Sequence, residues 1–245
     1  MDRVITQIRN NLDGIRDRMG RASAKCGRDP LDTHLVVVTK TRPVEVIRAA
    51  ILAGAKLLGE NYPDEAQAKI QEIRQENPQG VSWHMIGHVQ SRKARIVAEE
   101  FDFLHSLDSI KLANKLDRIL SETGRVLPVL LEFNVGGEES KSGWDASDQD
   151  RWPELLPALE QILKLKQLNL CGLMTMPPLF SNPENVRPYF KKLRNLREYL
   201  ETQVEGVSLR ELSMGTSADF EVAIEEGATY VRIGQAVLGA RSPKV

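Results

Sequence analysis

The sequence has few cysteines and no long apolar run. Only two cysteines, Cys26 and Cys171, occur among 245 residues, and they lie too far apart to suggest a metal motif or a disulfide framework. No segment approaches the roughly 18 consecutive apolar residues that a membrane-spanning helix needs. The first residues are charged throughout, unlike a signal peptide. We therefore expect a cytoplasmic protein with reduced thiols and no membrane partner.

The sequence also lacks an excess of charge of either sign and is poor in aromatic residues. Lys and Arg total 33 and Asp and Glu total 34, so no global field favours nucleic acid. One basic segment contains Arg92, Lys93 and Arg95, but aromatic residues make up only 5% of the chain and none is interleaved with it. We interpret this segment as a solvated helix face rather than an RNA-binding surface.

Hydrophobic residues make up 41% of the chain, enough for one continuous core. After an amphipathic first helix (Val4, Ile5, Ile8, Leu12, Ile15, Met19), short apolar segments alternate with helical periods. The predicted strands are residues 35–39, 56–59, 82–86, 101–106, 127–134, 168–175, 208–213 and 229–233. The predicted helices between them are residues 44–53, 64–76, 92–99, 109–122, 151–166, 182–204 and 220–226, with Ser109 and Asn182 as N-caps.

Strands separated by helices predict parallel pairing with right-handed crossovers. Eight such units in about 250 residues indicate an α/β fold, a single (β/α)₈ TIM-type barrel with an additional N-terminal helix. A doubly wound open sheet is the alternative, because periodicity does not report closure. We predict one domain, residues 1–245, and interpret the Gly-rich segment 136–143 as a loop after the fifth strand.

Lys40 follows the apolar run of residues 35–39 and precedes Pro43. We predict that it lies at the carboxyl end of a buried strand, where barrel active sites gather. Desolvation there disfavours the ammonium form, lowers the pKa of the amine and frees it to condense with an aldehyde. The alternative is a lysine whose stem packs while its ammonium group reaches water.

Two glycine-bearing turns follow the last two predicted strands. Barrels commonly hold a phosphate there with backbone N–H groups, and glycine lets an oxygen approach the backbone. The candidate phosphate-binding residues are Ser213, Gly215, Thr216, Ser217, Gly234 and Gln235. Ordinary turn and cap chemistry is the alternative for each turn. A reactive lysine with a phosphate cradle indicates a phosphorylated aldehyde, and pyridoxal 5'-phosphate (PLP) is the commonest in proteins.

Two further side chains could face such a ligand. Arg232 ends the eighth strand, and its guanidinium beside a pyridine nitrogen would weaken the ring as an electron sink; a salt bridge within the barrel is the alternative. Asn61 follows the second strand and could contact the ring or the oxygen derived from the aldehyde. His84 and His88 are four residues apart, but a strand and turn would place them on different faces, so we predict no metal site.

Seven ordered motifs carry a family resemblance: residues 38–43 (VTKTRP), 59–62 (GENY), 84–90 (HMIGHVQ), 134–143, 172–178 (GLMTMPP), 212–219 (LSMGTSAD) and 231–234 (VRIG). Together they resemble the YggS/PROSC-type pyridoxal phosphate homeostasis proteins over nearly the full chain. The resemblance implies a barrel similar to the alanine racemase N-terminal domain, an internal aldimine at Lys40, and phosphate held by residues 213–217 and 234–235. Thr216 replaces a usual methionine, Arg92 an often-seen asparagine, and Pro63 follows the second motif.

The resemblance implies a monomeric PLP carrier in vitamin B6 homeostasis, without catalytic residues, and with PLP-dependent apoenzymes as possible recipients. The alternative is a PLP-dependent amino-acid racemase or lyase. Racemisation needs acid–base groups on both faces of the ring, and alanine racemases take one of them from a second domain that we do not find in this sequence. An aldolase-like barrel acting on a sugar phosphate is a third reading.

Overall fold

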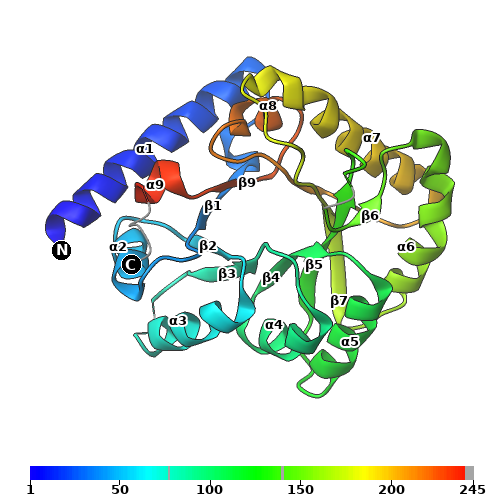
Figure 1. The fold of residues 1–245 in the computed structure, drawn as a ribbon, viewed down its shortest axis with the longest axis horizontal. Coiled ribbons are helices and arrows are strands. Elements are labelled where there is room, and N and C mark those ends of the chain that lie inside the picture. Colours follow the sequence, from blue (N-terminus) through cyan, green and yellow to red (C-terminus); the bar gives the residue numbers. More distant parts are fainter. Residues whose placement is uncertain (77, 139–140, 241–245) are drawn as a thin grey trace.

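Eight parallel strands close into a barrel in the computed structural model, which describes residues 1–76, 78–138 and 141–240 (Figure 1). The barrel strands are β1 (His34–Val38), β2 (Leu57–Glu60), β3 (Ser82–Met85), β4 (Phe103–Leu107), β5 (Leu127–Asn134), β7 (Leu168–Met174), β8 (Glu211–Ser213) and β9 (Tyr230–Ile233). Pairing of β1 with β9 and of β4 with β5 completes the ring. The predicted barrel is therefore confirmed, and the open sheet is excluded.

Helices encircle the barrel, as Figure 1 shows. They are α1 (Asp2–Lys25), α2 (Val44–Leu52), α3 (Pro63–Gln75), α4 (Ala94–Glu100), α5 (Ile110–Ser121), α6 (Leu156–Leu163), α7 (Arg187–Gln203), α8 (Phe220–Glu225) and α9 (Gln235–Leu238). Short 3-10 helices are η1 (Pro30–Asp32), η2 (Ser91–Lys93), η3 (Gln149–Leu155) and η4 (Pro183–Val186). Both predicted caps are confirmed, since Ser109 accepts from the Leu112 amide and Asn182 from the Glu184 amide.

Several predicted boundaries differ from the structure for local reasons. The predicted helix 151–166 divides into η3 and α6, because Pro153 and Pro157 lack the N–H that a continuous helix needs. The strand expected at 208–213 is limited to Glu211–Ser213. A two-residue strand, β6 (Trp144–Asp145), pairs with β5 after the loop 136–143, of which residues 139 and 140 lie outside the described ranges.

The main core lies between the outer face of the barrel and the helices. Helix α1 contributes Ile8, Leu12, Ile15 and Met19, as its spacing predicted, whereas Val4 is 46% exposed. Across the described ranges, no helix is long and apolar enough to cross a membrane. Cys26 and Cys171 are both free thiols.

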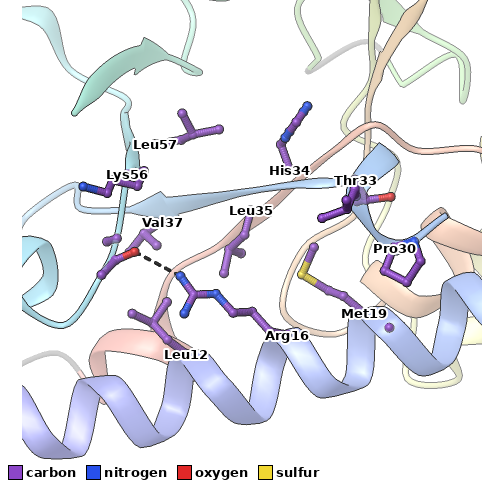
Figure 2. A pocket seen from close by; sticks show the side chains of 14 residues that line it. Leu12, Arg16, Met19, Pro30, Thr33, His34, Leu35, Val37, Lys56 and Leu57 are labelled. Carbon is purple, nitrogen blue, oxygen red and sulfur yellow. Dashed lines mark hydrogen bonds between the residues drawn. The ribbon is translucent and has the colours of Figure 1, made fainter. Parts of the chain in front are cut away.

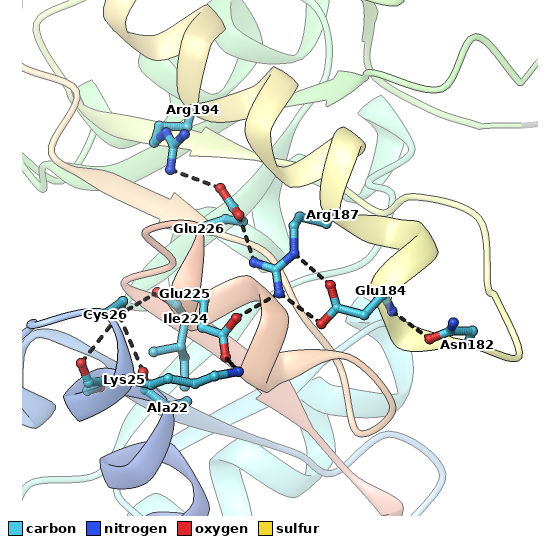
Figure 3. A network of polar contacts seen from close by, with 11 residues as sticks. Ala22, Lys25, Cys26, Asn182, Glu184, Arg187, Arg194, Ile224, Glu225 and Glu226 are labelled. Carbon is cyan, nitrogen blue, oxygen red and sulfur yellow. Dashed lines mark hydrogen bonds and ion pairs between the residues drawn. The ribbon is translucent and has the colours of Figure 1, made fainter.

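A network of charged side chains ties α8 to its neighbours (Figure 3). Arg187, at the start of α7, donates to Glu184, Glu225 and Glu226 at 2.7–2.8 Å. Lys25, at the end of α1, donates to Glu225 at 2.7 Å. Glu226 is 4% exposed and is neutralised by two arginines, Arg187 and Arg194, at 2.8 and 2.9 Å. The network therefore fixes α8, which packs behind one of the predicted phosphate loops.

Candidate functional site

A cavity of about 420 Å³ opens at the carboxyl ends of the barrel strands. This volume is typical of a small-molecule site. Seven predicted site residues line it: Lys40, Asn61, Thr216, Ser217, Arg232, Gly234 and Gln235. Ser213 and Gly215 do not line it and lie in the layer behind. Side chains from opposite ends of the sequence therefore meet at the end of the barrel where barrel active sites gather.

The turn that carries Lys40 is fixed on both sides. Thr39 is fully buried and donates its hydroxyl proton to Glu60 Oε1 at 2.8 Å. Thr41 has a φ of +61°, an uncommon conformation for a β-branched residue, and its amide donates to Glu65 Oε1 at 2.7 Å. Because such strain persists only where the surroundings over-determine it, the backbone at Lys40 is held in one orientation.

A buried lysine contacts both carboxylates that hold this turn. Lys69, on α3, donates to Glu60 Oε1 at 3.2 Å and forms a shorter ion pair with Glu65. Burial raises the pKa of the Glu60 carboxyl, and Lys69 opposes that change. The two carboxylates that hold Thr39 and Thr41 therefore share one ammonium group.

The loop after β8 contributes three consecutive residues, Thr216, Ser217 and Ala218, to the cavity wall. Thr216 is itself occupied, because its amide and hydroxyl both donate to Asp219 Oδ1, at 2.6 and 3.1 Å. Within the described ranges, the amides of Ser217 and Ala218 donate to no protein acceptor. Successive unpaired N–H groups of this kind form a concavity that suits an anion. Thr216 thus helps to fix the predicted phosphate loop through Asp219, and its role toward a phosphate stays a prediction.

Both glycines of the predicted cradle lie close to other parts of the protein, and Gly215 is the more constrained of the two. Gly215 has a φ of +93°, and an added Cβ would lie 2.6 Å from the Ala223 Cβ on α8. A Cβ at Gly234 would lie 3.3 Å from the Val38 side chain. Close packing against α8 and β1 is therefore a further reason for glycine at these two positions, and access of a phosphate oxygen to the backbone stays a prediction.

Arg232 lies in the wall of the cavity and is only 4% exposed. Its guanidinium donates to Ser213 Oγ at 2.5 Å, to the Thr175 carbonyl at 2.9 Å, and to Met176 Sδ. These acceptors are all neutral, so Arg232 does not form the alternative, a salt bridge, with any residue that the structure describes. Burial lowers the pKa of Arg232 to about 10, which leaves the group charged at neutral pH.

Asn61 lines the cavity and has a buried polar atom without a hydrogen-bond partner among the described residues. Its Oδ1 atom is buried and accepts no hydrogen bond from the described residues. A buried, unsatisfied amide oxygen costs about 1–3 kcal/mol, so a ligand donor there would be stabilising. The remaining walls are mostly apolar side chains that sequence reasoning did not single out: Val38, Ile86, Met176, Leu179 and Ala218.

The two histidines of the third motif have separate partners. His84 lies in β3 and contacts His105, whereas His88 lies beyond the strand and pairs with Asp108 at 2.7 Å. In the described part of the chain, no group of His, Cys, Asp and Glu side chains is arranged to hold a metal ion. The basic segment is also paired, with Lys93 bound to Asp64 and Arg95 to Glu99 and Glu122.

Glu132, on β5, is a buried carboxylate that sequence reasoning did not single out. It is 8% exposed, and its Oε2 atom has no hydrogen-bond partner among the described residues. Burial, with a smaller effect from Asp108, raises the pKa of Glu132 to about 7, although Arg232, His88 and Lys141 oppose the change. The folded protein therefore binds a proton at Glu132 in a pH range where the unfolded chain does not.

This binding predicts a decrease in stability as pH rises. Between pH ~4.5 and ~7 the folded state holds more protons at Glu132 than the unfolded state, so the free energy of unfolding falls across that window. Glu132→Gln should remove the effect and be more stable than the wild type at pH 8 by roughly 2–4 kcal/mol. Urea unfolding at pH 5 and pH 8 measures this, and equal pH dependence in both proteins would contradict it.

A second cavity, of about 460 Å³, lies between α1 and the amino-terminal ends of β1 and β2 (Figure 2). Its walls are mainly apolar and include Leu12, Met19 and Leu35, with Arg16 donating to the Gly54 carbonyl at 3.0 Å. None of the predicted site residues lines it. The cavity around Lys40 is therefore the candidate site.

Comparison with known proteins places this barrel in a family. The model for the alanine racemase N-terminal domain matches residues 8–242. The pyridoxal phosphate homeostasis protein of Vibrio alginolyticus is 39% identical over 238 residues, which cover 97% of this chain and 99% of the relative.

Solved structures agree with this assignment. PipY of Synechococcus elongatus PCC7942 with PLP bound is 35% identical, with a TM-score of 0.81, covering 95% of this chain and 100% of that one. Alanine racemase of Clostridium difficile 630 is 16% identical, with a TM-score of 0.67 over 98% of this chain and 57% of that one, which shows a shared fold alone. The chain therefore belongs to the alanine racemase N-terminal domain family and, within it, to the pyridoxal phosphate homeostasis proteins.

Proposed function

We propose that this protein binds PLP in the cavity around Lys40 and takes part in PLP homeostasis as a carrier. The main support for this proposal is that several groups suited to PLP meet in one cavity. An amine, a buried cation and two unpaired backbone amides line or border one cavity of about 420 Å³. Full-length similarity to pyridoxal phosphate homeostasis proteins, and to a solved relative with PLP bound, supports the same ligand.

The residues match the ligand group by group. Lys40 would supply the amine for the covalent link, and the amides of Ser217 and Ala218, with the turn at Gly234 and Gln235, would bind the phosphate. The buried Oδ1 of Asn61 would gain a partner. PLP supplies an aldehyde and an electron-withdrawing ring, and Arg232, which stays charged, would face that ring and limit its use as an electron sink.

Storage and transfer fit the cavity better than turnover. Among the described residues that line it, Lys40 and Arg232 are the side chains with titratable groups, and Arg232 stays charged at neutral pH. Two-base racemisation would need a second proton carrier on the opposite face of the ring. We therefore propose that bound PLP is released to apoenzymes that require it.

A spectroscopic titration tests binding. We expect the purified protein to gain a visible absorption band when PLP is added, at one equivalent per chain, and to lose it when an apoenzyme that binds PLP more tightly is added in excess. Protein that stays colourless at every PLP concentration would contradict the proposal. Turnover of any amino acid at about 1–1000 per second in a deuterium-exchange assay would instead establish an enzyme.

A further inference from the structure

Aromatic rings, rather than branched aliphatic side chains, occupy the barrel interior near Arg232. His84, Phe103, His105 and Tyr230 form a cluster with ring centroids 4.8–5.8 Å apart. Bulky aliphatic residues usually fill this position in barrels. Two buried imidazoles in a barrel interior therefore need a physical reason.

The imidazoles belong to a continuous hydrogen-bond chain that ends at the cavity. Arg232 Nη1 contacts Ser213 Oγ at 2.5 Å, and Ser213 Oγ contacts His105 Nδ1 at 2.8 Å. His105 Nε2 then contacts His84 Nδ1 at 2.8 Å, and His84 Nε2 contacts Ser82 Oγ at 3.2 Å. The chain crosses the barrel from β9 through β8, β4 and β3.

Two arrangements of protons can run along this hydrogen-bond chain, and only one of them gives the hydroxyl proton of the buried Ser213 an acceptor. In that arrangement Ser213 Oγ accepts from the guanidinium, which can only donate, and gives its own proton to His105 Nδ1. His105 must then carry its proton on Nε2 and donate to His84 Nδ1, and His84 in turn donates from Nε2 to Ser82. Neither ring can hold a second proton and still accept. Burial agrees with this, since it lowers the pKa of His84 to about 3 and that of His105 well below its usual value.

We propose that His105 is a positioning residue for Arg232, acting through Ser213. By taking the Ser213 proton, His105 directs the oxygen lone pair at the guanidinium and so holds the buried cation in the cavity wall. His84 fixes the tautomer of His105 that makes this possible. The effect on PLP rests on the proposed function, whereas the proton arrangement can be measured in the protein without any ligand.

Three variants distinguish a positioning role of His105 from a role in packing alone. His105→Leu removes the acceptor, so PLP affinity should fall about tenfold, the size of one hydrogen bond to a charged group. The pH at which the bound chromophore changes absorbance should also shift. His105→Asn keeps an acceptor oxygen near the position of Nδ1 and should recover most of both properties. Phe103→Leu changes the packing around both imidazoles but removes no hydrogen bond of the hydrogen-bond chain, so it should leave both properties unchanged.

Nitrogen-15 spectra of the histidine rings provide the ligand-independent measurement. We expect His84 and His105 to stay neutral, with the proton on Nε2, through the pH range in which an exposed histidine becomes charged. A proton on His105 Nδ1, or PLP binding and a chromophore titration in His105→Leu equal to the wild type, would overturn the inference. If the wild type bound no PLP, the proposed function would fail. The nitrogen-15 spectra would still decide whether the hydrogen-bond chain from Arg232 to Ser82 exists.

Discussion

Replacing Lys40 by methionine is expected to abolish the visible absorption band of the PLP-loaded protein and to weaken PLP retention on the order of 100-fold, roughly 3 kcal/mol. Methionine keeps an unbranched stem of similar length against the cavity wall but removes the amine. The phosphate contacts at Ser217 and Ala218 would remain, so weak non-covalent binding should persist. Equilibrium dialysis combined with absorption spectra measures both quantities.

The matched control is Lys111→Met. Lys111 is exposed on α5, away from the residues that line the cavity. Its substitution removes the same charge and should change neither the absorption band nor retention. A Lys40→Met protein with wild-type colour and retention would show that the amine of Lys40 has no part in binding.

Gly172→Ala should destabilise the barrel by roughly 3–5 kcal/mol, because its added Cβ would overlap backbone rather than a flexible side chain. That Cβ would lie 1.9 Å from the Glu211 carbonyl oxygen on the neighbouring strand β8. Any relief must move β8 away from β7, and with it Ser213, whose carbonyl accepts from the Thr175 amide at 3.1 Å. Thermal unfolding should therefore occur roughly 10 °C lower, with weaker PLP binding at temperatures where the variant stays folded.

Gly20→Ala provides the contrasting control. Gly20 lies inside α1 and an added Cβ meets nothing within 4 Å, so the better helix propensity of alanine should stabilise the protein by about 0.5–1 kcal/mol. Equal unfolding temperatures for the two variants would contradict the view that the close approach of β7 and β8 is a geometric constraint.

The fold and the cavity wall were largely predictable from sequence because both follow from periodicity. Alternating strands and helices imply a barrel, and residues just past strand ends, such as Lys40 and Gln235, must then gather at one end. The resemblance to pyridoxal phosphate homeostasis proteins is likewise confirmed by the family comparison. The roles of individual site residues toward PLP stay predictions.

The layer behind the cavity was not predictable, because closure of the barrel creates it. His105 is 21 residues from His84 and 108 from Ser213 in sequence, and a histidine in a buried strand is usually a satisfied core residue. Thr216 carried a signal that we did not use. Asp219 follows it by three residues, a spacing at which a carboxylate can bind an amide and hydroxyl at a helix start.

The most direct measurement of the central claim is borohydride reduction of the PLP-loaded protein followed by peptide mass spectrometry. Reduction makes the link between an amine and PLP permanent, so the modified residue can be read from the fragment masses. We expect one added pyridoxyl phosphate group per chain, on the peptide that contains Lys40. Modification at a different lysine, or no stable modification of protein that binds PLP, would contradict it.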